Sequence, residues 1–586
     1  MLTDSYSPHT DAPPRADAPD DGRATDRIAG PVERPVGAAR RGPWWRSALW
    51  LAGALTVAVT AIVVLPAPAV GTPGWWIATL LLHAPFAAIL LFLAAGSIER
   101  LGFLAIGRSH RPRGRLPEDA PLVCVQVPLF NEPAVAARVI AAVGALRWPA
   151  ARLEIQILDD STEQTAREIV DVAAADLRRR SGAQVSVRRR DARTGYKAGA
   201  LEAGRRATSA EFITIFDADF LPTPDFLDRT IPHFFRADGS ADEGLALVQA
   251  QWGHLNADQS PLTRSQSLWV DDHHTVQMSW RSAAWGFVNF TGTAGVWRAS
   301  AIERAGGWRA ASLVEDCELS FRHLFAGYRT TFVRDVIAPA ELPTTVTAYK
   351  AQQKRWTQGW AQVQRLHLRT LARECETSAT RRLHLLYHMC IPWQWPLWAL
   401  WITLMPALIQ SGLWFGAFGT AAGLGVYLVP MTLWLAMATV IASAATPELY
   451  PDRLRRFGAR IARVAPYVVI NTGMLPHQLC AFLEGLAGPL HTEFERTPKS
   501  AAVAGSKPLP PAQRAKRSSV RIHWPYVSAE AAFVAFQLTW AIVFAAQGQV
   551  WPALGATFLA GCVLTLGAFY GDHAGRMFFV IDTRRR

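Results

Sequence analysis

The chain has 586 residues, of which 50% are hydrophobic and 18% are charged, with a formal net charge of +13 and 23 tryptophans. It is too apolar and aromatic for a disordered protein, and it is longer than one ordinary domain of roughly 100–200 residues. A soluble domain combined with membrane segments fits better. Six scattered cysteines without a C-x-x-C pair argue against a disulfide framework or a zinc site.

The basic residues are concentrated beside apolar runs. This distribution is the positive-inside pattern of a membrane protein, so we expect contact with membrane lipid and no nucleic-acid partner. The clusters contain Arg40, Arg41 and Arg46; Arg100, Arg108, Arg111, Arg113 and Arg115; Arg453, Arg455, Arg456, Arg460 and Arg463; and Arg584, Arg585 and Arg586.

The first hundred residues contain a tail and two apolar runs. Residues 1–40 are rich in Pro, Asp, Arg and Ala, which predicts a disordered cytoplasmic tail. The run from Ser47 to Val70 exceeds the ~20 apolar residues that cross a bilayer. A second run covers Trp75 to Ser97. We therefore expect a transmembrane hairpin over residues 47–97, with both outer ends on the basic, cytoplasmic side.

Residues 99–382 are predicted to form a cytoplasmic α/β domain. Apolar, β-rich runs alternate there with helical stretches, which favours a largely parallel sheet with ligand groups at the carboxyl ends of its strands. The predicted strands lie in the segments LVCVQVPLF, LEIQILDD, VSVRRR, EFITIFDADF and ALVQAQW.

The remainder of the chain returns to apolar segments. A second hairpin is expected over residues 391–444 and a third over residues 527–570, giving about six transmembrane helices. Between these hairpins, the apolar run 465–486 has basic residues on both sides. We therefore predict interfacial or re-entrant helices and a linker over residues 450–522 on the cytoplasmic side. Residues 571–586 form a basic cytoplasmic tail.

Asp217 and Asp219 follow an apolar run. In an extended strand, residues two apart share a face, so both carboxylates could reach one hard cation that also bridges phosphate oxygens. A solvated strand end is the alternative for an isolated D-x-D.

Two earlier segments carry candidate nucleotide contacts. Asp159 and Asp160 end a predicted strand at the sheet edge where a nucleoside would bind, with a helix N-cap as the alternative role. Lys197, between Gly195 and Gly199, precedes a helical stretch and offers an ammonium to a diphosphate.

Two later segments carry candidate catalytic and sugar-binding groups. Glu315 and Asp316 begin an amphipathic helix, where they could act as caps, or Asp316 could be the general base that deprotonates an acceptor hydroxyl. Gln352, Arg355 and Trp356 offer a diphosphate-binding fork and an aromatic face for a sugar ring. A structural role in a membrane-interface belt is the alternative for the tryptophan.

Nine motifs occur in one order over residues 120–375: VPLFNE, ILDDSTEQT, GYKAGAL, IFDADFLPTPDF, FTGTAGVWR, AGGW, VEDCELSFR, ELP and QQKRW. Together they resemble the processive family-2 glycosyltransferases, which include bacterial cellulose synthase and the plant cellulose-synthase-like A and C proteins. The resemblance implies a glycosyltransferase-A domain, with a Rossmann-like mixed sheet, inserted in a multi-pass α-helical membrane protein.

The resemblance also implies roles for individual residues. Asp159 and Asp160 would contact the nucleoside, Asp217 and Asp219 would hold Mg²⁺ or Mn²⁺, and Asp316 would be the base. Segment 494–499, FERTPK, is similar to the gating loop of bacterial cellulose synthase, so Thr497 and Lys499 would close over the nucleotide. The donor and diphosphate site would add Gln352 and Arg355, and the acceptor would contact Trp356 and Glu315.

These observations predict an inverting, metal-dependent enzyme of the inner membrane with a cytoplasmic catalytic domain. The expected donor is UDP-glucose or GDP-mannose, the acceptor is a growing β-linked glucan or mannan, and the product crosses the membrane toward periplasmic or outer-membrane export partners. Transfer of a single sugar to a lipid is the alternative, and a non-catalytic pore or scaffold subunit is a further one.

Overall fold

The computed structural model describes residues 44–106, 113–445, 457–490, 499 and 523–568. The predicted tails 1–40 and 571–586, the linker 500–522 and most of the proposed gating segment, including Thr497, lie outside these residues. The assignment of domains and membrane sides therefore stays a prediction.

A mixed seven-stranded sheet lies at the centre of the α/β region. Its order is β3-β2-β1-β4-β6-β5-β7 within the part of the chain that the structure describes. The strands are β1 (Val123–Leu129), β2 (Leu153–Asp159), β3 (Gln184–Arg188), β4 (Phe212–Ile215), β5 (Leu245–His254), β6 (Gly295–Arg298) and β7 (Arg329–Ala340). The pairs β1/β2, β2/β3, β1/β4 and β5/β7 are parallel, whereas β6 is antiparallel to both β4 and β5.

All five predicted strands are present, and two further strands were not predicted. β6 has only four residues, which is too short for a periodic pattern. β7 is long but contains Arg334, Asp335 and Pro339, which weaken its apolar signal. Because β6 enters the sheet in the reverse direction, the sheet is mixed, as the glycosyltransferase-A resemblance implied.

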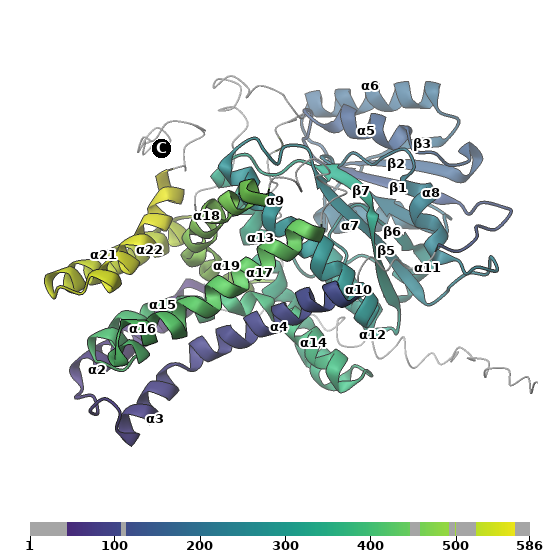
Figure 1. Ribbon diagram of the computed structural model, residues 1–586. Coiled ribbons are helices and arrows are strands. Elements are labelled where there is room, and N and C mark those ends of the chain that lie inside the picture. Colours follow the sequence, from purple (N-terminus) through teal and green to yellow (C-terminus); the bar gives the residue numbers. More distant parts are fainter. Residues whose placement is uncertain (1–43, 107–112, 446–456, 491–498, 500–522, 569–586) are drawn as a thin grey trace, which may run out of the picture.

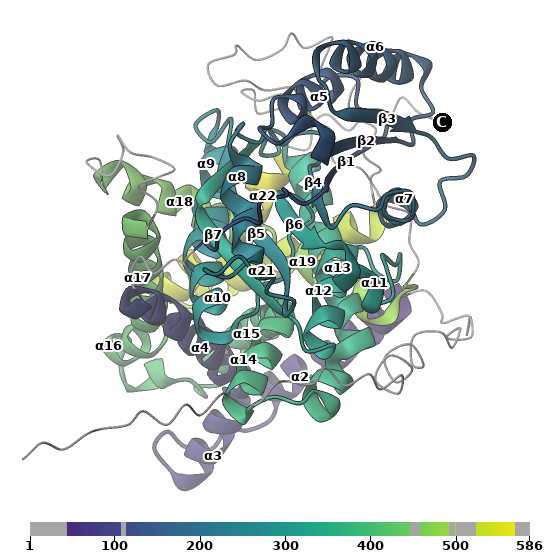
Figure 2. The same cartoon turned by 90° about the vertical axis from the view of Figure 1, so that its right-hand side faces the viewer.

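Helices cover both faces of the sheet (Figures 1 and 2). On one face, α5 (Ala136–Gly144) and α6 (Gln164–Arg180) bury apolar side chains such as Val139 and Val170 against β1 and β2. The other face is covered by α7 (Tyr196–Arg206), α11 (Ala299–Arg304) and α12 (Glu315–Phe325). Burying one such Val or Leu side chain contributes about 1.5–3 kcal/mol, so the two cores hold the strand ends in fixed positions.

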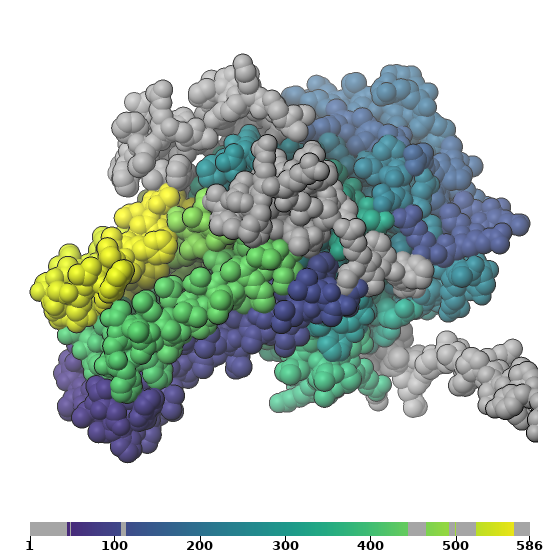
Figure 3. All heavy atoms as spheres, viewed as in Figure 1, coloured from purple at the N-terminus to yellow at the C-terminus, as the bar shows by residue number. Residues whose placement is uncertain are grey.

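Six helical segments of the described residues are long and apolar enough to cross a membrane, which agrees with the predicted number. They form an elongated body beside the sheet (Figure 3). The segments are Trp44–Val64 (α2), Ala84–Ile106 (α4), Ile391–Phe418 (with α15, Gln394–Gln410), Thr420–Ala442 (with most of α17, Val429–Ala445), Trp524–Ala546 (α21) and Val550–Gly567 (in α22, Val550–Ala568).

The second predicted span, Trp75–Ser97, differs from the observed helices at both ends. It is divided at His83 into α3 (Pro73–Leu82) and α4, since Pro85 lacks the amide hydrogen that would continue the helix. The helix then extends past Ser97 because Glu99 and Arg100 are buried in ion pairs with Arg281 and Asp272.

Four helices lie between the sheet and the membrane helices: α9 (Pro261–Asp271), α13 (Val346–Arg369), α18 (Phe457–Gly473) and α19 (Leu475–Ala487) (Figure 1). α9 packs on α18, and α13 packs on α19. The predicted segment 465–486 corresponds to α18 and α19, which have 17 and 13 residues and are not among the candidate spans. Its interfacial position stays a prediction.

Candidate active site

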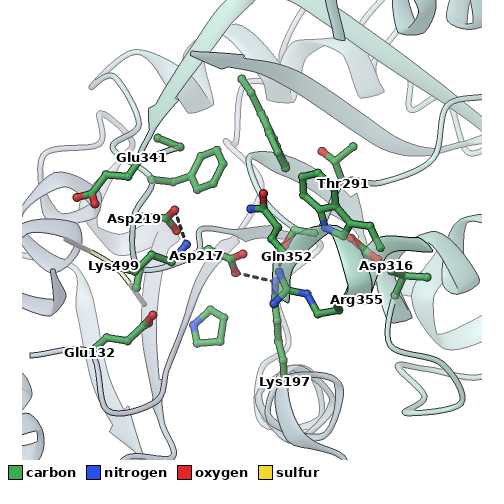
Figure 4. A pocket seen from close by; sticks show the side chains of 18 of the residues that line it. Glu132, Lys197, Asp217, Asp219, Thr291, Asp316, Glu341, Gln352, Arg355 and Lys499 are labelled. Carbon is green, nitrogen blue, oxygen red and sulfur yellow. Dashed lines mark hydrogen bonds and ion pairs between the residues drawn. The ribbon is translucent and has the colours of Figure 1, made fainter. Parts of the chain in front are cut away.

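A cavity of about 170 Å³ opens at the carboxyl ends of β1, β2 and β4 (Figure 4). Ligands of open α/β sheets bind at this edge, where the strand order reverses. Most of the predicted site residues line this cavity: Asp160, Lys197, Asp217, Asp219, Glu315, Asp316, Gln352, Arg355, Trp356 and Lys499.

The prediction that Asp217 and Asp219 continue an extended strand is wrong. β4 ends at Ile215, and the two carboxylates lie in a turn in which the amide of Phe220 donates to the carbonyl of Asp217. The amide of Asp217 also donates to Oγ1 of Thr293, at 3.0 Å. This turn, and not the alternation of a strand, brings both carboxylates to the cavity.

Each of these carboxylates faces a lysine (Figure 4). Nζ of Lys197 lies 2.6 Å from Oδ1 of Asp217, and Nζ of Lys499 lies 2.5 Å from Oδ2 of Asp219. Burial raises the pKa of Asp219 despite the attraction of Lys499. Burial also acts to lower the pKa of Lys499, but Asp219 and Glu132 outweigh it and raise the pKa.

The carboxylate pair suits a hard divalent cation. Oδ1 of Asp219 is buried without a hydrogen-bond partner, so this acceptor is available to a ligand inside the cavity. Oxygen ligands are those that Mg²⁺ and Mn²⁺ prefer. Within the described residues, no group of three or more His, Cys, Asp or Glu side chains could hold a metal. A cation here would therefore share its coordination with water or a bound diphosphate.

Asp316 lies in the first turn of α12, next to Glu315. Neither residue is the N-cap, which is Val314, although Oδ1 of Asp316 accepts a bond from the amide of Cys317 at 2.8 Å. Burial and the neighbouring charge of Glu315 raise the pKa of Asp316 to about 7. A carboxyl group with this pKa can accept a proton near neutral pH.

Gln352, Arg355 and Trp356 project from α13 into the cavity. The guanidinium of Arg355 is attracted by four carboxylates, those of Glu315, Asp217, Asp316 and Asp219, although burial lowers its pKa. A bound diphosphate would add negative charge beside Arg355, and a divalent cation would add positive charge beside the carboxylates. The ring of Trp356 meets Trp269 of α9 edge to face, with centroids 5.7 Å apart.

The two predicted nucleoside contacts are separated by the structure. Asp160 lines the cavity and is held by a bidentate ion pair with Arg190, at 3.0 and 2.5 Å. Asp159 is fully buried and does not line the cavity; its carboxylate accepts from Arg189 and from the amide of Ser161. Neither is the N-cap of α6. Asn131 of the VPLFNE motif accepts bonds from the amides of Thr162 and Glu163.

Several cavity residues were not predicted as site residues. They are Glu132, Arg193, Trp252, Trp269, Thr291 and Glu341. Glu132 and Glu341 stand in the VPLFNE and ELP motifs, so the motif order was the available signal. The guanidinium carbon of Arg193 lies 3.4 Å from the centroid of the Phe130 ring, and both residues line the cavity.

A second cavity, of about 350 Å³, adjoins the first and extends to the candidate membrane helices. Both cavities are lined by Asp316, Trp356, Trp269 and Thr291. Buried polar atoms without a hydrogen-bond partner lie along the second one: Oγ1 of Thr291, Nε2 of Gln353, Nε1 of Trp252, Nε1 of Trp434 and Nδ1 of His388. Its far end is lined by Ile89, Phe92 and Leu93 of α4, Trp395 and Trp398 of α15, and Trp434 of α17.

Comparison with known proteins agrees with this geometry. The model of "Glycosyl transferase family 2" matches residues 124–253, and that of "Glycosyl transferase family group 2" matches residues 212–444. Residues 124–444 of this chain belong to glycosyltransferase family 2. This family assignment confirms the predicted resemblance and the glycosyltransferase-A type of fold.

Several curated relatives come from plants. The chain is 40% identical over 271 residues to glucomannan 4-beta-mannosyltransferase 1 of Oryza sativa subsp. japonica, covering 46% of this chain and 51% of that protein. It is 38% identical over 270 residues to glucomannan 4-beta-mannosyltransferase 2 of Arabidopsis thaliana, covering 46% and 49%. The match thus spans about half the length of these relatives.

Solved structures are more distant. The mannosyltransferase PcManGT from Pyrobaculum calidifontis, in complex with GDP-Man and Mn²⁺, is 21% identical with a TM-score of 0.44; the match covers 64% of this chain and 99% of that one. TarS 1–349 of S. aureus, in complex with UDP, is 12% identical with a TM-score of 0.32, covering 62% and 89%.

Proposed function

We propose that this chain is an inverting, metal-dependent polysaccharide synthase that polymerises a β-linked mannan or glucan from GDP-mannose or UDP-glucose and passes it through the inner membrane. The main support is the position of Asp316, which lines both the cavity at the strand ends and the cavity that extends between the membrane helices. At this junction, a donor could approach Asp316 from the cavity at the strand ends, and an acceptor could approach it from the second cavity. The plant relatives named as mannosyltransferases favour a mannose donor.

The donor would occupy the cavity at the strand ends. Asp160 lies on the nucleoside side, and Lys197, Arg355 and Gln352 lie beside the carboxylates of Asp217 and Asp219, where a diphosphate would be bound. A divalent cation held by Asp217 and Asp219 would supply positive charge that stabilises the leaving diphosphate. Lys197 and Arg355 add donors that are fixed before the reaction, which costs no reorganisation in the transition state.

Transfer would proceed by direct displacement. The carboxylate of Asp316 takes the proton from the acceptor hydroxyl. At the same time, the oxygen of that hydroxyl forms a bond to the anomeric carbon of the donor sugar. The bond from this carbon to the diphosphate breaks, and its electron pair leaves with the nucleoside diphosphate. A single displacement inverts the anomeric centre, so an α-linked donor gives a β-linked product without a covalent enzyme intermediate.

The second cavity would hold the acceptor chain. Tryptophan faces suit the C–H faces of sugar rings, and the unpartnered polar atoms along the wall suit their hydroxyls. Trp356 and Trp269 stand at the junction with the donor cavity, where the terminal sugar of the acceptor would stack. The second cavity continues toward α4, α15 and α17, which supports passage of the polymer across the membrane. Export partners would then receive it on the other side.

The test is transfer by the full-length protein in lipid nanodiscs, with Mn²⁺ or Mg²⁺ and radiolabelled GDP-mannose, UDP-glucose or UDP-N-acetylglucosamine. We expect a long polymer from one hexose donor that is sensitive to a linkage-specific β-mannanase or β-glucanase and absent with Asp316→Asn. A single labelled sugar in the lipid extract would contradict polymerisation, and no incorporation from any donor would contradict the proposal.

A further inference from the structure

Three helices meet at a buried ion pair beside the donor cavity. Nζ of Lys350, on α13, donates to both carboxylate oxygens of Glu530, on α21, at 2.8 and 2.9 Å. His477, on α19, lies between them, with Nδ1 3.3 Å from Oε1 of Glu530 and Nε2 3.2 Å from the carbonyl oxygen of Lys350. The Lys350 and Glu530 side chains are only 3% and 7% exposed. α21 is one of the candidate membrane spans.

A second contact joins the same helices one turn further along α13. Oη of Tyr526, on α21, donates to Oε2 of Glu484, on α19, at 2.5 Å. Nζ of Lys354, on α13, lies 3.4 Å from the same oxygen and 5.0 Å from the centroid of the Tyr526 ring. Two consecutive turns of α13 are therefore fixed to both α19 and α21.

The residues of α13 that make these contacts lie on one side of the helix, and the residues that line the donor cavity lie on another. Lys350 and Lys354 are four residues apart and share a face of the helix. Gln352 and Arg355 line the cavity and alternate with them in sequence. Because each residue turns the helix by about 100°, Gln352 points roughly 200° away from Lys350. A shift of α13 at the ion pair would thus move both proposed diphosphate-binding side chains.

A buried ion pair contributes little net stability, which suggests that this pair serves to position α13. Desolvation can cancel the attraction between the two charges, and replacing both partners with uncharged residues of similar volume is often neutral or stabilising. Removing only one partner leaves an unpaired buried charge, which is strongly destabilising. Glu530 is also the one charged residue within α21, where an apolar residue would be enough to anchor the helix in a membrane.

We propose that Lys350 and Glu530 are positioning residues for the donor site, so that α21, a helix of the last membrane hairpin, sets the position of Gln352 and Arg355. The inference rests on the proposed function, because it assigns Gln352 and Arg355 to the donor diphosphate. A misplacement of about 1 Å can cost about 10²-fold in rate. Asp217 and Asp219 lie on the segment after β4, so their positions do not depend on this ion pair, and a displaced Arg355 would not weaken their binding of a cation.

The test compares variants of the full-length protein in nanodiscs. The double variant Lys350→Met with Glu530→Gln removes both charges at nearly constant volume. We expect no decrease in the thermal unfolding temperature, a loss of about 10- to 100-fold in kcat and in GDP or UDP affinity, and no loss of Mn²⁺ affinity without nucleotide. Lys350→Arg keeps the ion pair and should retain activity.

The control removes a partly exposed ion pair whose two residues line neither cavity. Arg329 and Asp242 pair at 2.7 Å and do not line either cavity, so Arg329→Met with Asp242→Asn should leave kcat unchanged. Should the double variant with Lys350→Met fail to fold, Lys350→Gln with Glu530→Gln, which also leaves no buried charge and keeps a polar side chain at both positions, should show the same selective loss.

Three outcomes would overturn the inference: wild-type kcat and nucleotide affinity in either folded double variant, equal losses in Lys350→Arg, or an equal loss of Mn²⁺ affinity. Arg355→Ala separates this failure from failure of the proposed function. If Arg355→Ala loses nucleotide affinity while the double variant does not, only the positioning role fails. If Arg355→Ala also binds nucleotide normally, the proposed donor site itself is wrong.

Discussion

Lys499 and Asp219 are 280 residues apart in sequence and form an ion pair inside the candidate active site, with Nζ 2.5 Å from Oδ2. The lysine therefore places a positive charge where a divalent cation would bind. Lys197 holds the neighbouring carboxylate, Asp217, in the same way. A cation that binds to Asp219 through this oxygen must displace Lys499 from it.

Replacing Lys499 by alanine should tighten metal binding. Without the competing ammonium, we expect the affinity for Mn²⁺ in the absence of nucleotide to rise by about tenfold, which corresponds to about 1.4 kcal/mol. Electron paramagnetic resonance of free Mn²⁺ measures this directly. Lys499→Arg keeps the cation and should bind Mn²⁺ like the wild type. Weaker Mn²⁺ binding by Lys499→Ala would exclude the competition.

Asp219→Ala should have the opposite effect on the metal. It removes a carboxylate from the proposed site, so we expect Mn²⁺ affinity to fall and the metal concentration required for half-maximal transfer to rise by at least about tenfold. Titration of Mn²⁺ and Mg²⁺ in the transfer assay checks this. An unchanged metal requirement would remove Asp219 from the metal site.

Asp316→Asn should abolish transfer and leave nucleotide binding intact. The amide keeps the size of the side chain but cannot accept the proton of the acceptor hydroxyl, and a general base contributes about 10²- to 10⁴-fold. Isothermal titration with GDP or UDP and Mn²⁺ should give the affinity of the wild type. Turnover near the wild-type rate would show that another group is the base.

The pH dependence of kcat/KM should report Asp316 in the free enzyme. Burial and the charge of Glu315 raise its pKa to about 7, and only the ionised carboxylate accepts a proton. As the pH falls below 7, kcat/KM should therefore decrease by about tenfold per unit. Glu315→Gln removes the like charge and should move this limb to lower pH. An unmoved limb would assign it to a different group.

Gly292→Ala should impair the base without unfolding the protein. Gly292 has φ +86°, and a Cβ there would lie 2.8 Å from Oδ2 of Asp316. The displaced carboxylate should reduce kcat by about 10- to 100-fold. Gly327 is a matched control, because its φ is +81° but no atom lies within 4 Å of the added Cβ. Both variants carry similar backbone strain, so equal kcat values in the two would contradict the contact with Asp316.

The sequence by itself determined the elements and the order of the chemistry. β1 is a nearly continuous apolar run, β2 alternates apolar with polar residues over most of its length, and the candidate membrane helices are long apolar segments. Both signals are local in the chain and follow from the burial of apolar surface. The ordered motifs, including D-x-D and QQKRW, also contain most of the residues that line the cavity.

The tertiary structure decided how these residues meet. Asp160 reaches the cavity while Asp159 does not, and a turn rather than a strand orients Asp217 and Asp219. Glu99 and Arg100 continue α4 because distant residues neutralise them, and Lys350 meets Glu530 across 180 residues. Such contacts depend on how separate elements pack. Hydropathy and residue spacing are local properties of the chain, so they do not predict which distant residue a side chain will contact.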